Sequence, residues 1–183
     1  MAQLTYTAIA SLDGYIEDEQ GSFEFAFPPP EVHAFANELD RPVGAHLYGR
    51  RMYETMVFWE TGGDDDPITR EYAELWRGAD KVVFSRTLEA ASSARTTIER
   101  EFSTDLVRRL KETSDTQLAI GGAELAGQAL AAGLVDEVRM LLAPVIVGGG
   151  KRALPDGVRA RLQLTETRSF EGGFVYLRYG VTV

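Results

Sequence analysis

The chain has 183 residues and a formal net charge of −9, from 28 acidic and 19 basic side chains. An acidic surface repels nucleic acid and anionic lipid, so neither is expected as a partner, and any bound anion needs a local basic pocket. The lack of cysteine excludes disulfides, zinc–thiolate sites and thiol nucleophiles, and it fits a cytoplasmic protein.

We expect a single domain over residues 1–183, with no signal peptide and no membrane span. Runs of β-branched, aromatic and other apolar residues predict strands at residues 4–10, 45–48, 81–85, 117–120 and 138–147. Segments with apolar residues at helical spacing lie between these runs. This alternation predicts an α/β fold with helices packed on a largely parallel sheet.

The predicted helices have recognisable ends. One begins at Pro30 and Glu31, because proline loses nothing at the first helical position and an acid suits the positive end of the helix dipole. Further helices are expected to begin after Gly49, at Ser103 or Thr104, and after Gly122 with an end at Gly133.

The C-terminal part of the chain changes its period. Residues 162–170 and 174–183 both alternate apolar with polar side chains, and Glu171-Gly172-Gly173 separates them. This pattern predicts a terminal antiparallel β-hairpin. A parallel body that ends in such a hairpin has a mixed sheet.

Three turns each follow a predicted strand and carry groups that suit phosphate. Gly49-Arg50-Arg51 brings two arginines to a helix start, Ser85-Arg86 offers a hydroxyl and a guanidinium, and Gly121-Gly122 precedes a helix whose amides can face a pyrophosphate. Ligands of open α/β sheets bind outside the carboxyl ends of strands, so the turns form one candidate site. Each turn taken alone is also explained as a plain connection with solvated side chains.

Together these motifs resemble the dihydrofolate reductase-like superfamily, and most closely the stand-alone proteins similar to the reductase domain of riboflavin biosynthesis. The resemblance covers nearly the whole chain in the expected order. The matching segments are Ser11-Leu12-Asp13-Gly14-Tyr15-Ile16, Gly49-Arg50-Arg51-Met52-Tyr53-Glu54, Ser85-Arg86-Thr87-Leu88, Ile120-Gly121-Gly122, Gly133-Leu134-Val135-Asp136-Glu137, Pro144 with Gly148-Gly149-Gly150, and the strand from Phe174 to Tyr179.

The resemblance implies a three-layer fold with a mixed, mainly parallel sheet of about eight strands. It also implies NADPH as the cofactor, with the turns at Gly49-Arg50-Arg51 and Ser85-Arg86 beside the adenosine 2′-phosphate. The pyrophosphate is expected on Gly121, Gly122, Ala123 and Glu124, and the nicotinamide near Ala8 and Ile16.

A hydride acceptor also needs a proton source. In dihydrofolate reductase the helix after the first loop carries an active-site carboxylate, and Glu31 lies in roughly the corresponding place. Asp13 is the second candidate catalytic acid, and Tyr53 or Glu54 can face the pocket from the second helix. The helix dipole alone also explains Glu31, and a simple turn explains Asp13.

The function that the resemblance implies is an NADPH-dependent reductase that transfers hydride to a small planar heterocycle, similar to 5-amino-6-(5-phosphoribosylamino)uracil reductase, and that forms a homodimer. Dihydrofolate reductase and a nucleotide-binding module with little or no turnover are the alternatives. The chain has no HxE…PCxxC pattern, so it cannot supply a zinc deaminase. We expect no metal, because His33, His46 and Asp64-Asp65-Asp66 are explained as structural or solvated residues.

Overall fold

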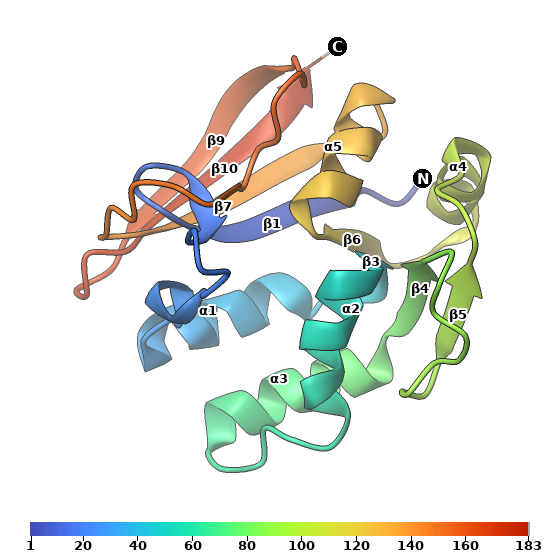
Figure 1. The fold of residues 1–183 in the computed structure, drawn as a ribbon, viewed down its shortest axis with the longest axis horizontal. Helices are drawn as coiled ribbons and strands as arrows, with labels where there is room; N and C mark the ends of the chain where they lie inside the picture. Colours follow the sequence, from blue (N-terminus) through green and yellow to red (C-terminus); the bar gives the residue numbers. More distant parts are fainter. Residues whose placement is uncertain (183) are drawn as a thin grey trace.

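The computed structural model describes residues 1–182, and its centre is a mixed eight-stranded sheet (Figure 1). Six neighbouring strands run parallel, and the seventh strand across the sheet is antiparallel to both of its neighbours. In order across the sheet the strands are β5 (Thr96–Glu99), β4 (Asp80–Phe84), β3 (Val43–Gly49), β6 (Gln117–Gly121), β1 (Leu4–Ser11), β7 (Glu137–Ala143), β10 (Val175–Thr182) and β9 (Arg161–Ser169).

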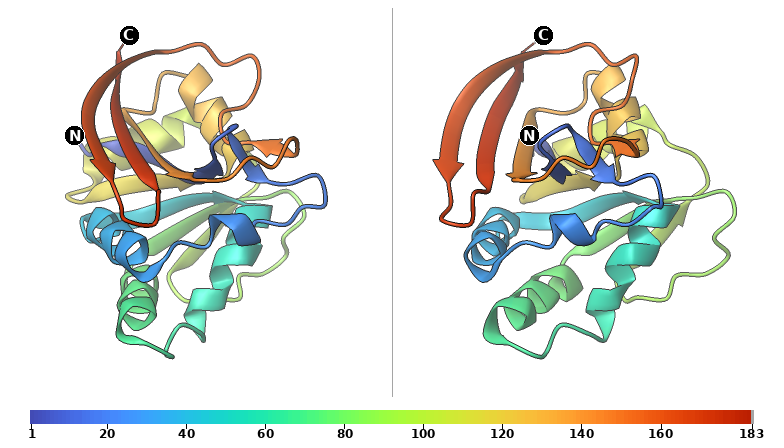
Figure 2. Two further views of the ribbon diagram at one scale, coloured as in Figure 1. Left: turned by 90° about the vertical axis from the view of Figure 1, so that its left-hand side faces the viewer. Right: turned by 60° about the vertical axis from the view of Figure 1, so that its left-hand side comes forward.

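Helices cover both faces of this sheet, which gives three layers (Figure 2). On one face α1 (Pro30–Asp40) and α3 (Pro67–Gly78) pack on each other, and the buried Tyr53 of α2 (Arg50–Met56) lies in one apolar cluster with Trp76 of α3. On the other face α4 (Thr104–Thr113) and α5 (Ala123–Ala131) bury apolar side chains against β1, β3 and β6. The predicted α/β fold and its C-terminal hairpin are therefore confirmed.

The caps explain why the helices begin where they do. Pro30 starts α1, and the Ser103 hydroxyl accepts a hydrogen bond from the Leu106 amide at the start of α4. Helix α3 was not predicted from the sequence, although Asp66 caps it by accepting hydrogen bonds from the amides of Ile68 and Thr69. The acidic loop before α3 is thus partly a helix cap.

Strand β7 ends earlier than predicted. The sequence pattern extended this strand to residue 147, but the ladder stops at Ala143 because Pro144 cannot donate a hydrogen bond and Gly148 and Gly150 have positive φ. The segment after β7 instead carries β8 (Lys151–Arg152), which pairs with β2 (Tyr15–Glu17) in a small second sheet. Neither β2, β8 nor the edge strand β5 was predicted from the sequence.

Two short 3₁₀ helices complete the secondary structure, η1 (Glu24–Ala26) and η2 (Val57–Glu60).

Acidic side chains hold the start of β7. The Asp136 carboxylate accepts a hydrogen bond from the Leu4 amide at 2.7 Å and pairs with Lys111 at 2.7 Å. Glu137 pairs with Arg139 and with Arg178. None of the helices within residues 1–182 is long and apolar enough to span a membrane.

Candidate functional site

The three predicted turns lie side by side at one edge of the sheet. Strands β4, β3 and β6 are neighbours, and their register places Gly49 opposite Phe84 and Tyr48 opposite Gly121. All three strands run parallel, so their carboxyl ends meet at this edge. Segments that are far apart in the sequence therefore form one site.

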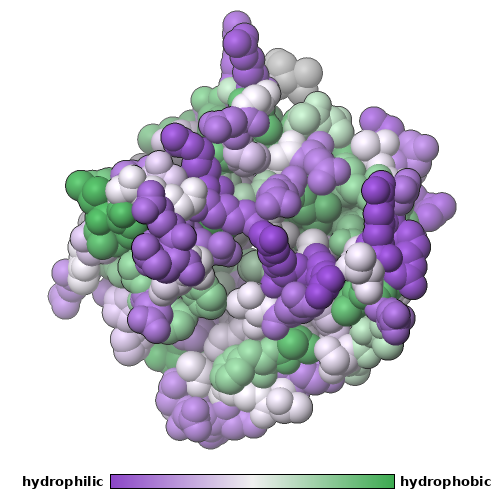
Figure 3. All heavy atoms as spheres, in the orientation of Figure 1, coloured by the Kyte–Doolittle hydropathy of each residue, from purple (hydrophilic) through white to green (hydrophobic). Residues whose placement is uncertain are grey.

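A cleft of about 590 Å³ opens over these turns, within the size range of ligand sites. Its charged lining side chains are Arg50, Arg51, Arg86, Arg100 and Lys151 against Glu101 and Glu124. Five cations against two carboxylates leave a local excess of three positive charges on a chain of net charge −9. Figure 3 shows hydrophilic side chains gathered between the positions of α2 and α5. The cleft is the basic pocket that an anionic ligand requires.

Arg50 joins two of the turns. Its guanidinium donates to the Glu54 carboxylate at 2.7 Å and to the Thr87 hydroxyl at 2.8 Å. Arg86 pairs with Glu101 at 2.9 Å, but both side chains are more than two thirds exposed, so this pair stabilises little. Arg51 lines the cleft with no carboxylate partner within the part of the chain that the structure describes.

The turn after β4 is held by its own hydrogen bonds. The buried Ser85 hydroxyl accepts from the amides of Thr87 and Leu88, and Arg100 donates to the Leu88 carbonyl at 2.7 Å. These bonds fix the shape of the turn. The backbone that carries Arg86 is therefore held in place by hydrogen bonds, to which Arg100 contributes.

Gly122 shapes the third turn. It is the N-cap of α5 with a φ of 91°, a conformation that glycine adopts without strain, and no side chain caps the helix. The first amides of α5 therefore lack side-chain partners and can receive an anion. Glu124 in the first turn of α5 pairs with Lys151 at 3.1 Å, which brings β8 to the cleft.

The comparisons with known proteins agree with this geometry. The model of the RibD C-terminal domain family matches residues 2–176. The chain belongs to this family. The resemblance predicted from the sequence motifs is thus confirmed.

Two proteins match this RibD C-terminal domain over most of its length, one in sequence and one in fold. It is 28% identical over 172 residues to the uncharacterized protein YyaP of Bacillus subtilis, covering 92% of this chain and 89% of YyaP. The putative riboflavin biosynthesis protein of Shewanella sp. PV-4 superposes with a TM-score of 0.78 at 19% identity, over 100% of both chains.

A bifunctional protein is also similar in fold. The deaminase and 5-amino-6-(5-phosphoribosylamino)uracil reductase of Thermotoga maritima superposes with a TM-score of 0.69 at 18% identity, over 99% of this chain and 57% of that one. The RibD C-terminal domain described here thus spans little more than half of that longer protein.

The residues expected at the nicotinamide lie outside the basic cleft. Ala8 is buried in β1 opposite Met140, and Ile16 lies in β2 with its side chain packed on the main core. Ala123 instead borders a second, smaller cavity of about 260 Å³ that also contains Lys151. Gly121 is buried directly beneath the cleft, where a Cβ would lie 2.8 Å from the Tyr48 ring.

The two candidate acids differ in their surroundings, and neither lines the basic cleft. The Asp13 carboxylate accepts hydrogen bonds from the amides of Val147 and Gly148 at 3.2 and 2.8 Å. The Ser11 side chain, followed by these two amides, holds the pKa of Asp13 below its ordinary value. Glu31 is exposed in the first turn of α1. Asp13 therefore favours its anion, whereas Glu31 is open to solvent.

The alternative candidates on α2 have other contacts. The Tyr53 hydroxyl is bonded to Ser93 at 2.8 Å and accepts from the Ser92 amide at 2.9 Å, so Tyr53 anchors a loop. Glu54 is occupied by Arg50.

Several cleft residues were missed by the sequence analysis. Arg100, Glu101 and Phe102 follow the unpredicted strand β5, and Gln128 lies one turn into α5. The order of strands in the sheet, which no local pattern encodes, brings them to the site. Lys151 has a usable signal in the sequence, because it follows three glycines, Gly148 to Gly150.

The histidines stay in structural surroundings. His46 is buried and stacks on Tyr48 with ring centroids 5.4 Å apart, and His33 lies beside Trp59 and Tyr72. Among the described residues, no group of three or more His, Asp or Glu side chains is placed to hold a metal ion.

Proposed function

We propose that the protein is an NADPH-dependent reductase that transfers hydride to a small planar heterocycle in the cytoplasm. The observation that carries the proposal is the convergence of three phosphate-type turns on one basic cleft at the carboxyl edge of β4, β3 and β6. Membership of the RibD C-terminal domain family and the fold shared with a uracil reductase support it.

The residues of the cleft fit this cofactor. NADPH carries a pyrophosphate and a 2′-phosphate, and the cleft supplies the uncapped start of α5 at Gly122 together with an excess of cations. Gly49 leaves open space beside the ligand, since a Cβ there would meet nothing within 4 Å. We propose that Arg50, Arg51, Ser85 and Arg86 hold the 2′-phosphate, and that Gly121, Gly122, Ala123 and Glu124 hold the pyrophosphate through their backbone.

Bound NADPH would supply the hydride. Ala8 and Ile16 are proposed to form the apolar floor near the nicotinamide, at the carboxyl half of β1 and in β2. The acceptor also needs a proton, for which Glu31 and Asp13 are the proposed donors. Asp13 has a lowered pKa and two amide partners, so it is better suited to hold the loop, and Glu31 is the stronger candidate.

We also propose that the protein forms a homodimer through β9. All nine residues of this edge strand are exposed, and Leu162 and Leu164 face outward with exposed fractions of 41% and 50%. An edge strand with free hydrogen-bonding groups and apolar side chains is a natural surface for pairing with a second copy.

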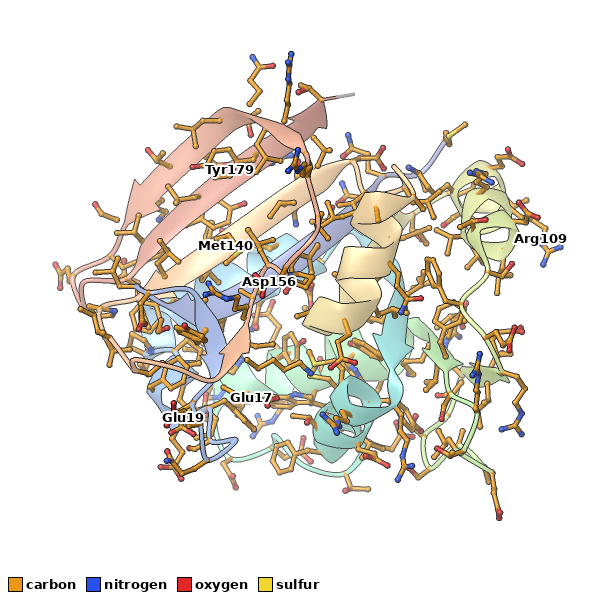
Figure 4. The ribbon with its side chains drawn as sticks, turned by 45° about the horizontal axis from the view of Figure 1, so that its top comes forward. Glu17, Glu19, Arg109, Met140, Asp156 and Tyr179 are labelled. Atoms are coloured by element: carbon orange, nitrogen blue, oxygen red, sulfur yellow. The ribbon has the colours of Figure 1, made fainter. Side chains whose placement is uncertain are left out.

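Cofactor discrimination tests the role of Arg50. Charge-assisted hydrogen bonds contribute roughly 1.5–3 kcal/mol each, so Arg50→Ala should weaken NADPH binding about ten- to a hundred-fold and barely change NADH binding. Calorimetric titration measures both. Arg109→Ala is the matched control, because Arg109 is exposed on α4 and outside the cleft (Figure 4). An equal loss for NADPH and NADH would show that Arg50 does not contact the 2′-phosphate.

Turnover tests the proton donor. Glu31→Gln keeps the size of the side chain and removes its acid, so the rate of NADPH oxidation should fall by about 10²-fold or more while NADPH affinity stays unchanged. Glu38→Gln, further along α1 and also exposed, serves as the control. Unchanged turnover in Glu31→Gln would remove this residue from the mechanism.

A further inference from the structure

The sheet continues beyond the basic cleft, and two segments meet there. They are residues 12–29 after β1 and residues 144–150 after β7. The Leu12 amide donates to the Val145 carbonyl at 2.8 Å, and the Asp13 carboxylate accepts from the Val147 and Gly148 amides. Given the proposed function, with adenosine at β4, β3 and β6, the acceptor of the hydride lies beside these two segments, which we term the acceptor rim.

The acceptor rim has the opposite charge from the cofactor cleft. Residues 12–29 contain five Asp and Glu side chains and no Lys or Arg, and residues 144–150 carry no charge at all. The Glu19 carboxylate lies against Gly149, where an added Cβ would be 2.6 Å away. Figure 4 shows Glu17 and Glu19 near each other at this rim. A phosphate there would meet carboxylates.

The closest cations along the chain already have partners. Lys151 pairs with Glu124 at 3.1 Å, and Arg152 pairs with Asp156 at 3.6 Å and lies over the Tyr15 ring of the rim, 5.4 Å from its centroid. These four charged side chains line the smaller cavity beside β8, whose two positive and two negative charges cancel. This cavity therefore offers no positive excess for the phosphate of an acceptor.

A further cation near this end of the sheet is committed elsewhere. The guanidinium of Arg168 on β9 lies over the rings of Phe35 and Phe170, 4.8 and 4.9 Å from their centroids. It covers the junction of α1 with the hairpin.

The acceptor rim also exposes large apolar side chains. Leu12, Ile146 and Phe27 have exposed fractions of 63%, 71% and 63%, and Phe23 contacts Phe27 edge to face with centroids 5.7 Å apart. Figure 3 shows an apolar patch at the left of the molecule, in the region of the segments that follow β1 and β7. Exposed aromatic and aliphatic groups suit a flat apolar ligand.

We propose that the acceptor of this enzyme is an unphosphorylated planar heterocycle that is neutral or cationic. It differs in this from the phosphoribosyl compound named for the Thermotoga relative. The reaction balances without another reactant. The carbon of a C=N or C=O bond in the acceptor gains a hydride, the nitrogen or oxygen of that bond gains a proton, and NADPH becomes NADP⁺. The cofactor cleft has an excess of three positive charges, whereas the acceptor rim provides carboxylates and apolar surface.

A matched pair of acceptors tests the proposal on the full-length protein. NADPH binding is measured first by calorimetry, because its absence would overturn the proposed function itself. NADPH oxidation is then followed with 5-amino-6-ribosylaminouracil and with its 5′-phosphate. Since like charges placed together disfavour binding, we expect kcat/KM to be at least about ten-fold higher for the unphosphorylated compound. Equal rates, or a preference for the phosphate, would overturn the inference and leave the reductase standing.

A charge reversal tests the electrostatic cause. Glu24→Lys, on η1 of the acceptor rim, should lower the KM of the phosphorylated compound several-fold with NADPH affinity unchanged, whereas Glu112→Lys on α4 should change neither. If Glu24→Lys left the ratio of kcat/KM for the two compounds unchanged, the electrostatic cause would be contradicted. If NADPH binds but neither compound binds or turns over, an acceptor of this heterocyclic class is excluded.

Discussion

At the scale of single residues, local sequence patterns indicate some side chains of the basic cleft, but they do not indicate the residues that these side chains contact. Arginines after a glycine at a helix start indicate phosphate binding. That Arg50 also bonds Thr87, 37 residues away, depends on the pairing of β3 with β4. Asp13 was predicted as a catalytic acid from its residue type, but its carboxylate accepts hydrogen bonds from backbone amides of a distant segment. Tertiary contacts decide such roles.

Buried His46 makes stability depend on pH. Burial is the main cause that lowers its pKa, with a further contribution from Lys81, while Asp40 opposes them. The unfolded chain takes up a proton near the ordinary value of about 6.5, whereas the folded chain does so only at lower pH. The free energy of unfolding should therefore fall as the pH drops below this value, until the folded pKa is reached.

His46→Phe tests this, because phenylalanine keeps a ring to stack on Tyr48 but cannot titrate. Urea unfolding at a series of pH values should show a flatter acid limb in the variant than in the wild type. His33→Phe is the comparison, since His33 is only half-buried and should account for less of the slope. An identical slope in His46→Phe and in the wild type would refute the account.

At the scale of elements, most strands and helices with strong local signals are where the sequence predicts them, and α3, which has a capping box at Asp66, is the exception. The alternation in residues 162–170 and 174–183 gives β9 and β10, and proline starts α1. The paired strands β2 and β8, by contrast, form only because two segments that are distant in the sequence meet. Gly150 permits this pairing, since a Cβ there would collide with the Glu17 carbonyl. Short strands of this kind carry too little local pattern to be predicted.

Strand β9 gives a prediction about assembly. In register, Leu164 lies opposite Tyr179 and Leu162 opposite Val181, and the two leucines, 50% and 41% exposed, present an apolar surface to solvent. If two copies pair there, Leu164→Glu places a charge in an apolar interface and should raise the dimer dissociation constant about a hundred-fold or more. Light scattering with size exclusion measures the mass. Arg109→Glu should stay dimeric, and a monomeric wild type would exclude this interface.

At the scale of the whole molecule, charge is divided between two regions of one sheet edge. The net charge of −9 predicted that an anion needs a local basic pocket, and the three turns assemble that pocket although they are far apart in the sequence. The family could be predicted from the order of the motifs. The identity of the acceptor could not, because the rim beyond β6 is built from loops whose mutual packing no periodicity encodes.

The proposed function and the proposed acceptor both depend on NADPH binding in the basic cleft. Calorimetric titration of the full-length wild-type protein with NADPH and with NADH tests it most directly. We predict saturable binding of one NADPH per chain, at least about ten-fold tighter than that of NADH, because the cleft offers charged partners for the 2′-phosphate that NADH lacks. Equal affinity for the two nucleotides, or binding of neither, would contradict the account.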